Sequence, residues 1–517
     1  MLKREKIYLA LISLVFVILT TIPYLYFWEK TPENNIYTGT NYLLSNDNFV
    51  YYSYIEQIKQ NSFLLQDLFT SEKLSPVLNV FWLSIGIFAK IFNLSAPLAF
   101  HISRILLSFV LVYVLYHFLS LFFKNYKSRI FALIFLLFTS GVGGIFLHFI
   151  SKPTNYLNQI YYYPIDQTLV ESNIFLSALL SPHHIASLIC ILLIFTFLLK
   201  SFLENSFKYL LISGFIALFY FQFHPFFFLL VALTLAMFIT LDSWNNKKIN
   251  YSWLLKSLAF LAFSLIPLVY FYFIQTNYYN NLKDLQNVTL SPQIWYILPS
   301  ILFYGIFIIL GLKNNKNDKN IILLNAFLLS WLLSGLVLMY LPLPFQSRFI
   351  KSLQIPMVIL DFQGLLYLKD KYLKRWNLLF IFAIFICFSL SNILVYYKIF
   401  DLTPKIDNLY ISTEKIKSLN WVKKNIDKSS IILAKKNDGL LITAFCGKKV
   451  FFGHPIETIN FQNKSLISKS IFEKENIDLA KENNINYIYQ DKKSKAIKNA
   501  LLENIFENSD VIIYKIR

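Results

Sequence analysis

The chain has 517 residues, of which 56% are hydrophobic, 18% are aromatic and only 15% are charged. This polar content is too low to cover a water-soluble globule, so the composition excludes a soluble protein and indicates a bilayer protein. A formal net charge of +19 would be compatible with binding to a nucleic acid. The basic residues fall mainly in short loops and the C-terminal tail, where they report membrane orientation instead, and no nucleic-acid partner is expected.

Apolar runs of about 20 residues recur between residues 1 and 397, each long enough to cross about 30 Å of hydrocarbon as a helix. They predict about eleven spans, near residues 7–28, 99–123, 130–150, 183–200, 208–222, 226–241, 257–275, 295–312, 321–340, 352–368 and 377–397. Lysine and arginine concentrate in the turns on the side of the N-terminus, as they do in cytoplasmic loops. We therefore expect a multi-pass protein of the cell membrane with a cytoplasmic N-terminus.

Two stretches of the loop at residues 29–98 do not fit this alternation. Residues 76–92 are apolar but short, and they carry Lys90. The stretch that begins at Asp47 repeats apolar residues at helical spacing, at Tyr51, Ile55 and Ile58. We predict that both stretches are helices at the outer interface, and we assign the loop to a membrane domain of residues 1–397.

After residue 398, helical patterns alternate with short β-type runs such as SIILAKK and DVIIYKIR. This alternation predicts a small α/β domain at residues 398–517, and an odd number of spans places it outside the cell. The expected fold is therefore an α-helical polytopic membrane protein with a small C-terminal α/β domain. The three cysteines show no CxxC spacing or metal-site pattern, so no cofactor is expected, and a divalent metal requirement stays open.

Uncommon polar residues gather at the outer ends of the expected spans: Asp47, Glu56, Asp67, Lys73, His101, Arg104, His148, Asp166, Glu171, His183, His184, His224 and Arg348. An ionisable group in a membrane costs about 2.5 to 3.5 kcal/mol at a helix centre, so such groups tend to be paired or functional. Structural alternatives remain open: Asp47 as a helix cap, His183 and His184 as interfacial polar groups. His224 has a structural alternative too, and Arg348 an interfacial anchoring one.

Three stretches carry a resemblance to a known family: DNFVY from residue 47, SEKLSPVLNVFWL from residue 71 and FHISRILLSFV from residue 100. Their order resembles that of the GT-C superfamily of membrane glycosyltransferases, in the protein mannosyltransferase and aminoarabinose transferase branch. The resemblance implies a polyprenyl-phosphate sugar donor, with Asp47 as the catalytic residue. It also implies substrate binding by Tyr51, Lys73 and Arg104. The family's second acidic residue is Asn48 here, and no motif identifies the sugar.

The expected chemistry is transfer of the sugar at the outer face to an acceptor that is a glycan, a lipid or a protein. Phosphate is a good leaving group, so one carboxylate suffices as general base, and Asp47 takes that role. Arg348 and Lys73 are the expected phosphate-binding residues. His224 and Glu171 would orient sugar hydroxyls, with His183 and His184 as further substrate-binding candidates.

Glu56 is expected to face water on the same helix as Asp47. Two other functions remain as alternatives to the enzyme. A transporter or flippase of lipid-linked saccharides would also need many spans and buried polar residues, although such proteins carry polar groups near the bilayer midplane. A structural or anchoring protein whose working part is the C-terminal domain is the third possibility.

Overall fold

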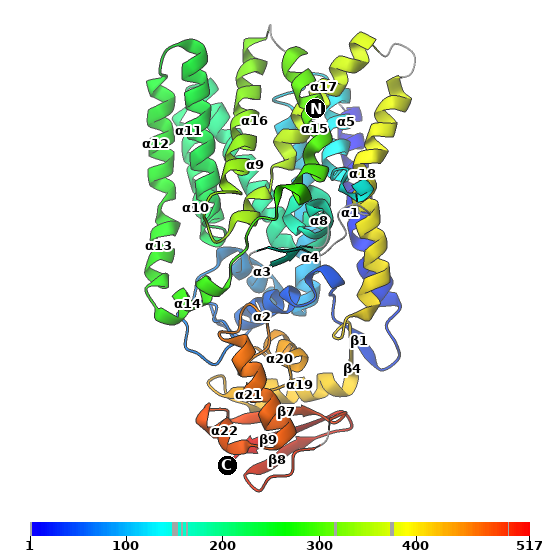
Figure 1. Cartoon of the computed structure of the whole chain (residues 1–517), viewed down its shortest axis with the longest axis vertical. Helices are drawn as coiled ribbons and strands as arrows, with labels where there is room; N and C mark the ends of the chain where they lie inside the picture. The colour runs from blue at the N-terminus through cyan, green and yellow to red at the C-terminus, as the bar shows by residue number, and fades with distance from the viewer. Residues whose placement is uncertain are drawn as a thin grey trace. The chain divides into compact units, whose positions relative to one another are not determined.

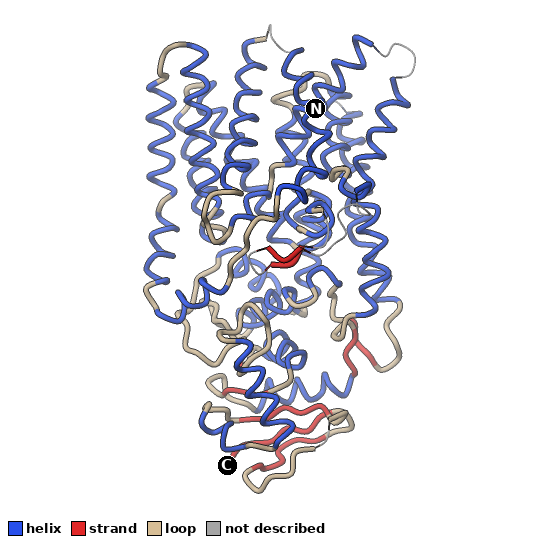
Figure 2. The backbone as a smooth tube through the Cα atoms, in the orientation of Figure 1, coloured by secondary structure: helices blue, strands red, loops and turns tan. Residues whose placement is uncertain are grey.

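The computed structural model describes residues 3–146, 154–156, 159–161, 164–314, 318–372, 377–494 and 496–517. Helices dominate, and the strands are short (Figure 2). The chain divides into two compact units. The first comprises Met1–Ile22, Arg104–Phe271 and Thr289–Lys398, and the second comprises Pro23–Ser103, Tyr272–Val288 and Ile399–Arg517. The loop at 29–98 thus groups with the C-terminal domain, whereas the sequence analysis assigns it to the membrane domain.

Long apolar helices build the first unit (Figure 1). Its helices, four of which have end residues in the second unit, are α1 (Lys3–Glu29), α4 (Ala96–Leu119), α5 (Tyr126–Phe138), α7 (Ile165–Thr168), α8 (Ile174–Leu180), α9 (Pro182–Leu203), α10 (Phe207–Phe223), α11 (Phe227–Asn246), α12 (Tyr251–Ser264), α13 (Ile266–Gln275), α15 (Ile294–Asn314), α16 (Lys319–Leu338), α17 (Gln354–Tyr372) and α18 (Asn377–Leu402). A two-stranded antiparallel pair, β2 (Thr154–Tyr156) and β3 (Gln159–Tyr161), also belongs to this unit.

Within the described residues, eight helical segments are long and apolar enough to cross a membrane: Lys3–Glu29, Ala96–Leu119, Pro182–Leu203, Phe227–Asn246, Tyr251–Gln275, Lys319–Leu338, Gln346–Lys369 and Leu379–Lys405. Large apolar side chains such as Leu106, Leu255 and Phe382 are exposed on these segments, as a lipid-facing surface requires. The total of eleven spans stays a prediction.

The expected span at 130–150 is wrong in its extent, because α5 ends at Phe138. The next residues read TSGVGG, and Gly141 has a φ of +141°, a conformation that a helix cannot continue through. His148 and the end of that expected span lie outside the described residues.

A glycine also allows α15 and α17 to pack closely. A Cβ atom at Gly364 would clash with the carbonyl of Phe307, so the lack of a side chain at this position permits the short distance between the two helices.

The second unit contains a five-stranded sheet in the order β6-β5-β7-β9-β8. Its strands are β5 (Ile431–Leu433), β6 (Lys449–Val450), β7 (Tyr487–Asp491), β8 (Leu502–Glu507) and β9 (Val511–Ile516). β5 runs parallel to β6 and β7, and β9 runs antiparallel to β7 and β8. The helices of this unit are α2 (Asp47–Lys59), α3 (Val80–Ile91), α14 (Tyr278–Gln286), α19 (Thr413–Asn425), α20 (Lys436–Leu441), α21 (Phe461–Lys474) and α22 (Ile477–Glu482).

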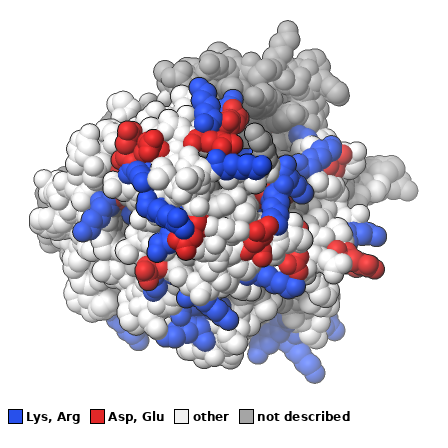
Figure 3. Space-filling model, turned by 90° about the horizontal axis from the view of Figure 1, so that it is seen from below, with Lys and Arg blue, Asp and Glu red and all other residues white. Residues whose placement is uncertain are grey.

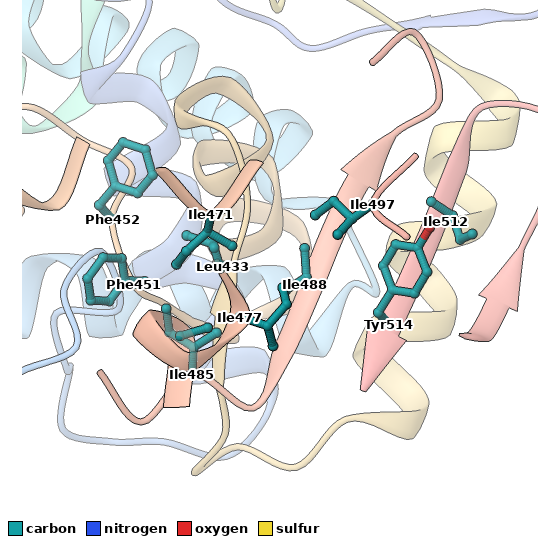
Figure 4. Close-up of a cluster of buried hydrophobic side chains, with 11 residues drawn as sticks. Leu433, Phe451, Phe452, Ile471, Ile477, Ile485, Ile488, Ile497, Ile512 and Tyr514 are labelled. Atoms are coloured by element: carbon teal, nitrogen blue, oxygen red, sulfur yellow. The ribbon is translucent and has the colours of Figure 1, made fainter. Parts of the chain in front are cut away.

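Leu433, Phe451, Ile471, Ile488 and Tyr514 lie in the apolar core of this sheet (Figure 4). A helix-covered sheet with its own core is what the alternating pattern after residue 398 predicts. A separate antiparallel pair joins β1 (Asn35–Tyr37) to β4 (Tyr410–Ser412), so the loop after α1 and the C-terminal domain share backbone hydrogen bonds. Acidic and basic side chains are interspersed over the face seen in Figure 3. Exposed ion pairs of this unit include Lys492 with Glu507.

Candidate functional site

Asp47 is the first residue of α2, and its carboxylate contacts the C-terminal domain. Asp47 Oδ1 lies 3.0 Å from Nε2 of His454, in the loop between β6 and α21. The Asp47 side chain is 44% exposed, whereas that of His454 is 3% exposed. The residue before the helix, Asn46, makes no side-chain capping bond. Oδ1 of Asp47 is bonded to His454, and because the side chain is 44% exposed, part of the carboxylate is accessible to a reactant.

Backbone contacts fix which nitrogen of His454 carries the proton. The amides of Ile456 and Glu457 both donate to His454 Nδ1, with N–N distances of 3.2 Å. Because Nδ1 accepts these bonds, it is unprotonated, and a neutral imidazole then carries its proton on Nε2. The Nε2–H group therefore donates to the Asp47 carboxylate.

The rest of α2 is also held by the C-terminal domain. Glu56 Oε1 lies 2.5 Å from Nζ of Lys423 in α19, and Gln60 Nε2 donates to the carbonyl of Cys446 over 3.0 Å. The expectation that Glu56 faces water is therefore wrong, because its side chain is buried. A Glu–Lys pair links two segments far apart in sequence, and an amphipathic pattern on α2 alone does not reveal it.

A second polar group lies in the first unit, which we call the histidine–lysine cluster: Glu171, His183, His184, His224 and Lys351. His183 and His184 are in the first turn of α9, and His224 directly follows α10. The ring centroid of His183 lies 3.9 Å from that of His184 and 5.6 Å from that of His224. Lys351 Nζ is 2.8 Å from His184 Nδ1 and 3.9 Å from Glu171 Oε1.

The bond between Lys351 and His184 sets the charge of the histidine–lysine cluster. An ammonium group can only donate, so His184 Nδ1 accepts and His184 is neutral in this arrangement. Lys351 is 2% exposed, and the carboxylate of Glu171 lies 3.9 Å from its ammonium group. Arg348, one turn before it, packs its guanidinium over the ring of Phe226 at 5.2 Å. The cluster thus holds a buried cation beside the neutral imidazole of His184.

Several polar atoms near Lys351 have no hydrogen-bond partner within the described residues. These are His224 Nδ1 and the hydroxyl of Ser352, both buried. Ser352 also has a φ of +73°, an uncommon conformation for a residue other than glycine. Buried polar atoms normally find partners, so their presence here together with backbone strain is typical of a ligand site. The sequence analysis does not select Lys351 or Ser352, because neither belongs to a recognisable motif.

The remaining predicted residues occupy different surroundings. Tyr51 stacks on Trp82 of α3, with ring centroids 4.8 Å apart. Lys73 is exposed in the loop between α2 and α3. Arg104 is buried and donates to the carbonyls of Thr20 and Ala178, so it joins α4 to α1 and α8. Asp47, Tyr51 and Lys73 thus belong to the second unit, whereas the other predicted site residues belong to the first.

An apolar groove of about 560 Å³ runs along the first unit between α1, α5, α8 and α18. Val15, Phe138, Phe175 and Tyr396 are among the residues that line it. Its wall is almost entirely hydrocarbon and aromatic, which suits a lipid chain.

No group of three or more histidine, cysteine or acidic residues suited to hold a metal ion occurs in the part of the chain that the structure describes.

No model of a known protein family and no curated protein matches this sequence. Solved structures do match. The oligosaccharyltransferase of Archaeoglobus fulgidus in its apo form has a TM-score of 0.53 and 13% identity, over 94% of this chain and 69% of that one. The same enzyme in complex with Zn and sulfate has a TM-score of 0.52 and 12% identity, over 93% and 67% of the two chains.

The arabinofuranosyltransferase AftD from Mycobacteria matches over all of this chain, with a TM-score of 0.50 and 11% identity. This chain corresponds to 42% of AftD. At identities this low, the structural match establishes a shared fold and not a shared activity. The two neighbours are an oligosaccharyltransferase and an arabinofuranosyltransferase, and their likeness to this chain agrees with the helical architecture described above. The chain therefore shares its fold with the archaeal oligosaccharyltransferase and with AftD.

Proposed function

We propose that this protein is a membrane glycosyltransferase that moves a sugar from a polyprenyl-phosphate donor to an acceptor at the outer face of the membrane. The observation that carries the proposal is the buried ammonium of Lys351, which lies beside the neutral imidazole of His184 and near polar atoms that lack partners among the described residues. The fold supports the same conclusion, since the neighbours named above transfer sugars. The transporter or flippase alternative gains no support from these neighbours.

The histidine–lysine cluster would bind the phosphate and part of the sugar of the donor. Lys351 and Arg348 contribute two positive charges and Glu171 contributes one negative charge, so the group favours an anion. A phosphate oxygen would accept from the Lys351 ammonium, and Arg348 would add a bidentate contact. The Ser352 hydroxyl and His224 Nδ1, which lack partners among the described residues, would complete hydrogen bonds to the ligand.

The apolar groove supports the lipid part of the donor. A polyprenyl chain is a branched hydrocarbon. It can pack against the apolar wall of this groove without leaving any polar group of the wall unpaired. The wall residues Val15, Phe175 and Tyr396 are apolar or aromatic, as such a ligand requires.

Asp47 would act as the general base. The acceptor hydroxyl or amide loses its proton to the carboxylate as its heteroatom forms a bond to the anomeric carbon, and the bond from that carbon to the phosphate oxygen breaks. Polyprenyl phosphate leaves with the electron pair of that bond. Phosphate is a stable anion, so the departure calls for cations and not for a strong acid. General bases of this kind contribute about 10² to 10⁴ in rate.

Donor binding to the purified protein tests the phosphate site. Arg348→Ala and Lys351→Met should each weaken the affinity for a polyprenyl-phosphate sugar by about tenfold or more, because each removes a charge-assisted hydrogen bond. Arg348→Lys should recover only part of the affinity, since the bidentate geometry is lost. Lys256→Met serves as the control, because this lysine contacts Ser201 and Asn205 in another part of the unit. Donor affinity equal to wild type in both site variants would remove the histidine–lysine cluster from the donor site.

A further inference from the structure

We propose that His454 of the C-terminal domain is a positioning residue for Asp47, so that this domain is part of the transfer machinery. The proposal rests on the proposed function, in which Asp47 is the general base. It starts from the 3.0 Å hydrogen bond between His454 Nε2 and Asp47 Oδ1. Both residues belong to the second unit, and 407 positions separate them in the sequence.

The imidazole of His454 is fixed from two sides. The amides of Ile456 and Glu457 hold Nδ1, and the ring packs edge-on against Phe69 with centroids 6.0 Å apart. The loop that carries His454 is itself bonded to the segment before α3, because Thr458 Oγ1 donates to the carbonyl of Phe69 over 2.7 Å. A buried ring held in this way cannot rotate freely, so its Nε2–H group points in one direction.

A half-exposed aspartate at the start of a helix has several rotamers of similar energy. The Nε2–H bond selects one of them and occupies only Oδ1. Oδ2 remains available to take the proton of the acceptor. A fixed base in a near-attack position is favourable, because a displacement of about 1 Å can cost on the order of 10² in rate.

The two nitrogens of His454 can be replaced separately. In His454→Asn, the amide oxygen lies close to the place of Nδ1 and can accept from Ile456 and Glu457, but the side chain no longer reaches Asp47. In His454→Gln, the longer side chain places an N–H donor near the position of Nε2. The asparagine variant therefore retains the loop and loses the bond to the base, whereas the glutamine variant retains the bond.

The test measures kcat, donor KM and thermal unfolding of the full-length protein with these variants. His454→Asn should lower kcat by roughly tenfold or more with little change in KM or in the unfolding temperature, and His454→Gln should recover most of the rate. Tyr489→Phe is the control, because it removes a buried hydrogen bond to Ser418 in the same domain and should leave kcat unchanged. A wild-type kcat in a folded His454→Asn protein would overturn the proposal.

Combination with Asp47→Asn gives a second criterion, which is applied to folded double-variant protein. If His454 acts through Asp47, its substitution should cause no further loss of kcat in a protein that already carries Asp47→Asn. Losses that multiply would contradict the proposal. If Asp47→Asn alone turns over normally, the proposed base fails instead, and if Asp47→Asn is inactive while His454→Asn is normal, only the role of His454 fails.

Discussion

At the scale of single residues, a substitution of Asp47 can distinguish a catalytic role of this side chain from a structural one. Asparagine caps a helix about as well as aspartate but cannot take a proton at neutral pH. Asp47→Asn should therefore fold and bind donor normally, while the transfer rate falls by roughly 10² or more. Single-turnover kinetics together with a donor-binding measurement would check this. Turnover close to wild type in the folded variant would redirect the search for a base to Glu171 or Asp166.

Asp166 is the less suitable of these two replacements. Its carboxylate accepts from the Ser300 hydroxyl over 2.7 Å and from the Gly143 amide over 3.1 Å, and the side chain is buried. Burial raises the pKa of Asp166, although the hydrogen bonds oppose this shift. These contacts give it a structural role, in which it holds the turn after α5.

Sequence reasoning at this scale selects residues but not their partners. Asp47 follows an apolar span within a matching motif, so its position can be predicted. His454 lies in a domain without a motif, and nothing local to either residue links them. Glu56 shows the same limit, because helical periodicity describes α2 alone and does not include Lys423 of the C-terminal domain. Long-range packing decides which face of an amphipathic helix is buried.

At the scale of elements, a buried ion-pair group joins three segments of the second unit. Lys283 of α14 lies 2.7 Å from Asp67 Oδ2, in the loop after α2, and also pairs with Glu457 beside His454. Burial raises the pKa of Asp67, and the Lys283 ammonium opposes that shift. Removal of the lysine would leave two carboxylates together in a poorly solvated place, which is costly.

Lys283→Met should therefore lower the stability of the protein by roughly 3 to 5 kcal/mol at neutral pH. The variant carries carboxylates whose folded pKa is raised further, so its deficit should shrink as the pH falls towards the range in which they protonate. Thermal unfolding at pH 7 and pH 5 would measure both effects. Lys405→Met is the matched control, because its pair with Asp401 is exposed and is worth about 0 to 1 kcal/mol. Equal unfolding temperatures for the two variants would contradict this account.

The elements themselves follow well from the sequence. Apolar runs predict the long helices because backbone hydrogen bonds must be satisfied inside lipid, and alternating patterns predict the C-terminal sheet. The helix predicted to begin at Asp47 agrees with α2, and the helix predicted at 76–92 agrees with α3, which begins four residues later. The glycines after Phe138 end α5 early, so the expected span there is too long. The total of eleven spans depends on such boundaries.

At the scale of the whole molecule, the lysine-rich turns predict that residues after about 400 are outside the cell. A single cysteine at Lys469, in α21, should react with an impermeant thiol reagent in intact cells. A single cysteine at the exposed Lys124 should react only after permeabilisation. The exposed native Cys387 is replaced by serine in both proteins. Labelling of the Lys469 position only after permeabilisation would overturn the orientation and, with it, transfer at the outer face.

The fold of the whole molecule is shared with enzymes that transfer sugars. The sugar and the acceptor are the parts of the proposed function that no residue pattern identifies. Sugar specificity depends on the shape and hydrogen bonds of a pocket, which differ among enzymes of one fold. The cationic and carboxylate groups described above are suited to any donor in which a sugar is attached to a lipid phosphate. A direct assay of the reaction is therefore more informative than a further comparison of folds.

The most direct measurement incubates the purified protein with a panel of polyprenyl-phosphate sugars and follows the release of polyprenyl phosphate with membrane-extracted glycan, lipid and protein acceptors. Our account predicts acceptor-dependent release for at least one sugar, lost by 10²-fold or more in Asp47→Asn and weakened in donor affinity in Arg348→Ala. Binding of the donors without transfer, or release that is equal in wild type and Asp47→Asn, would contradict the account.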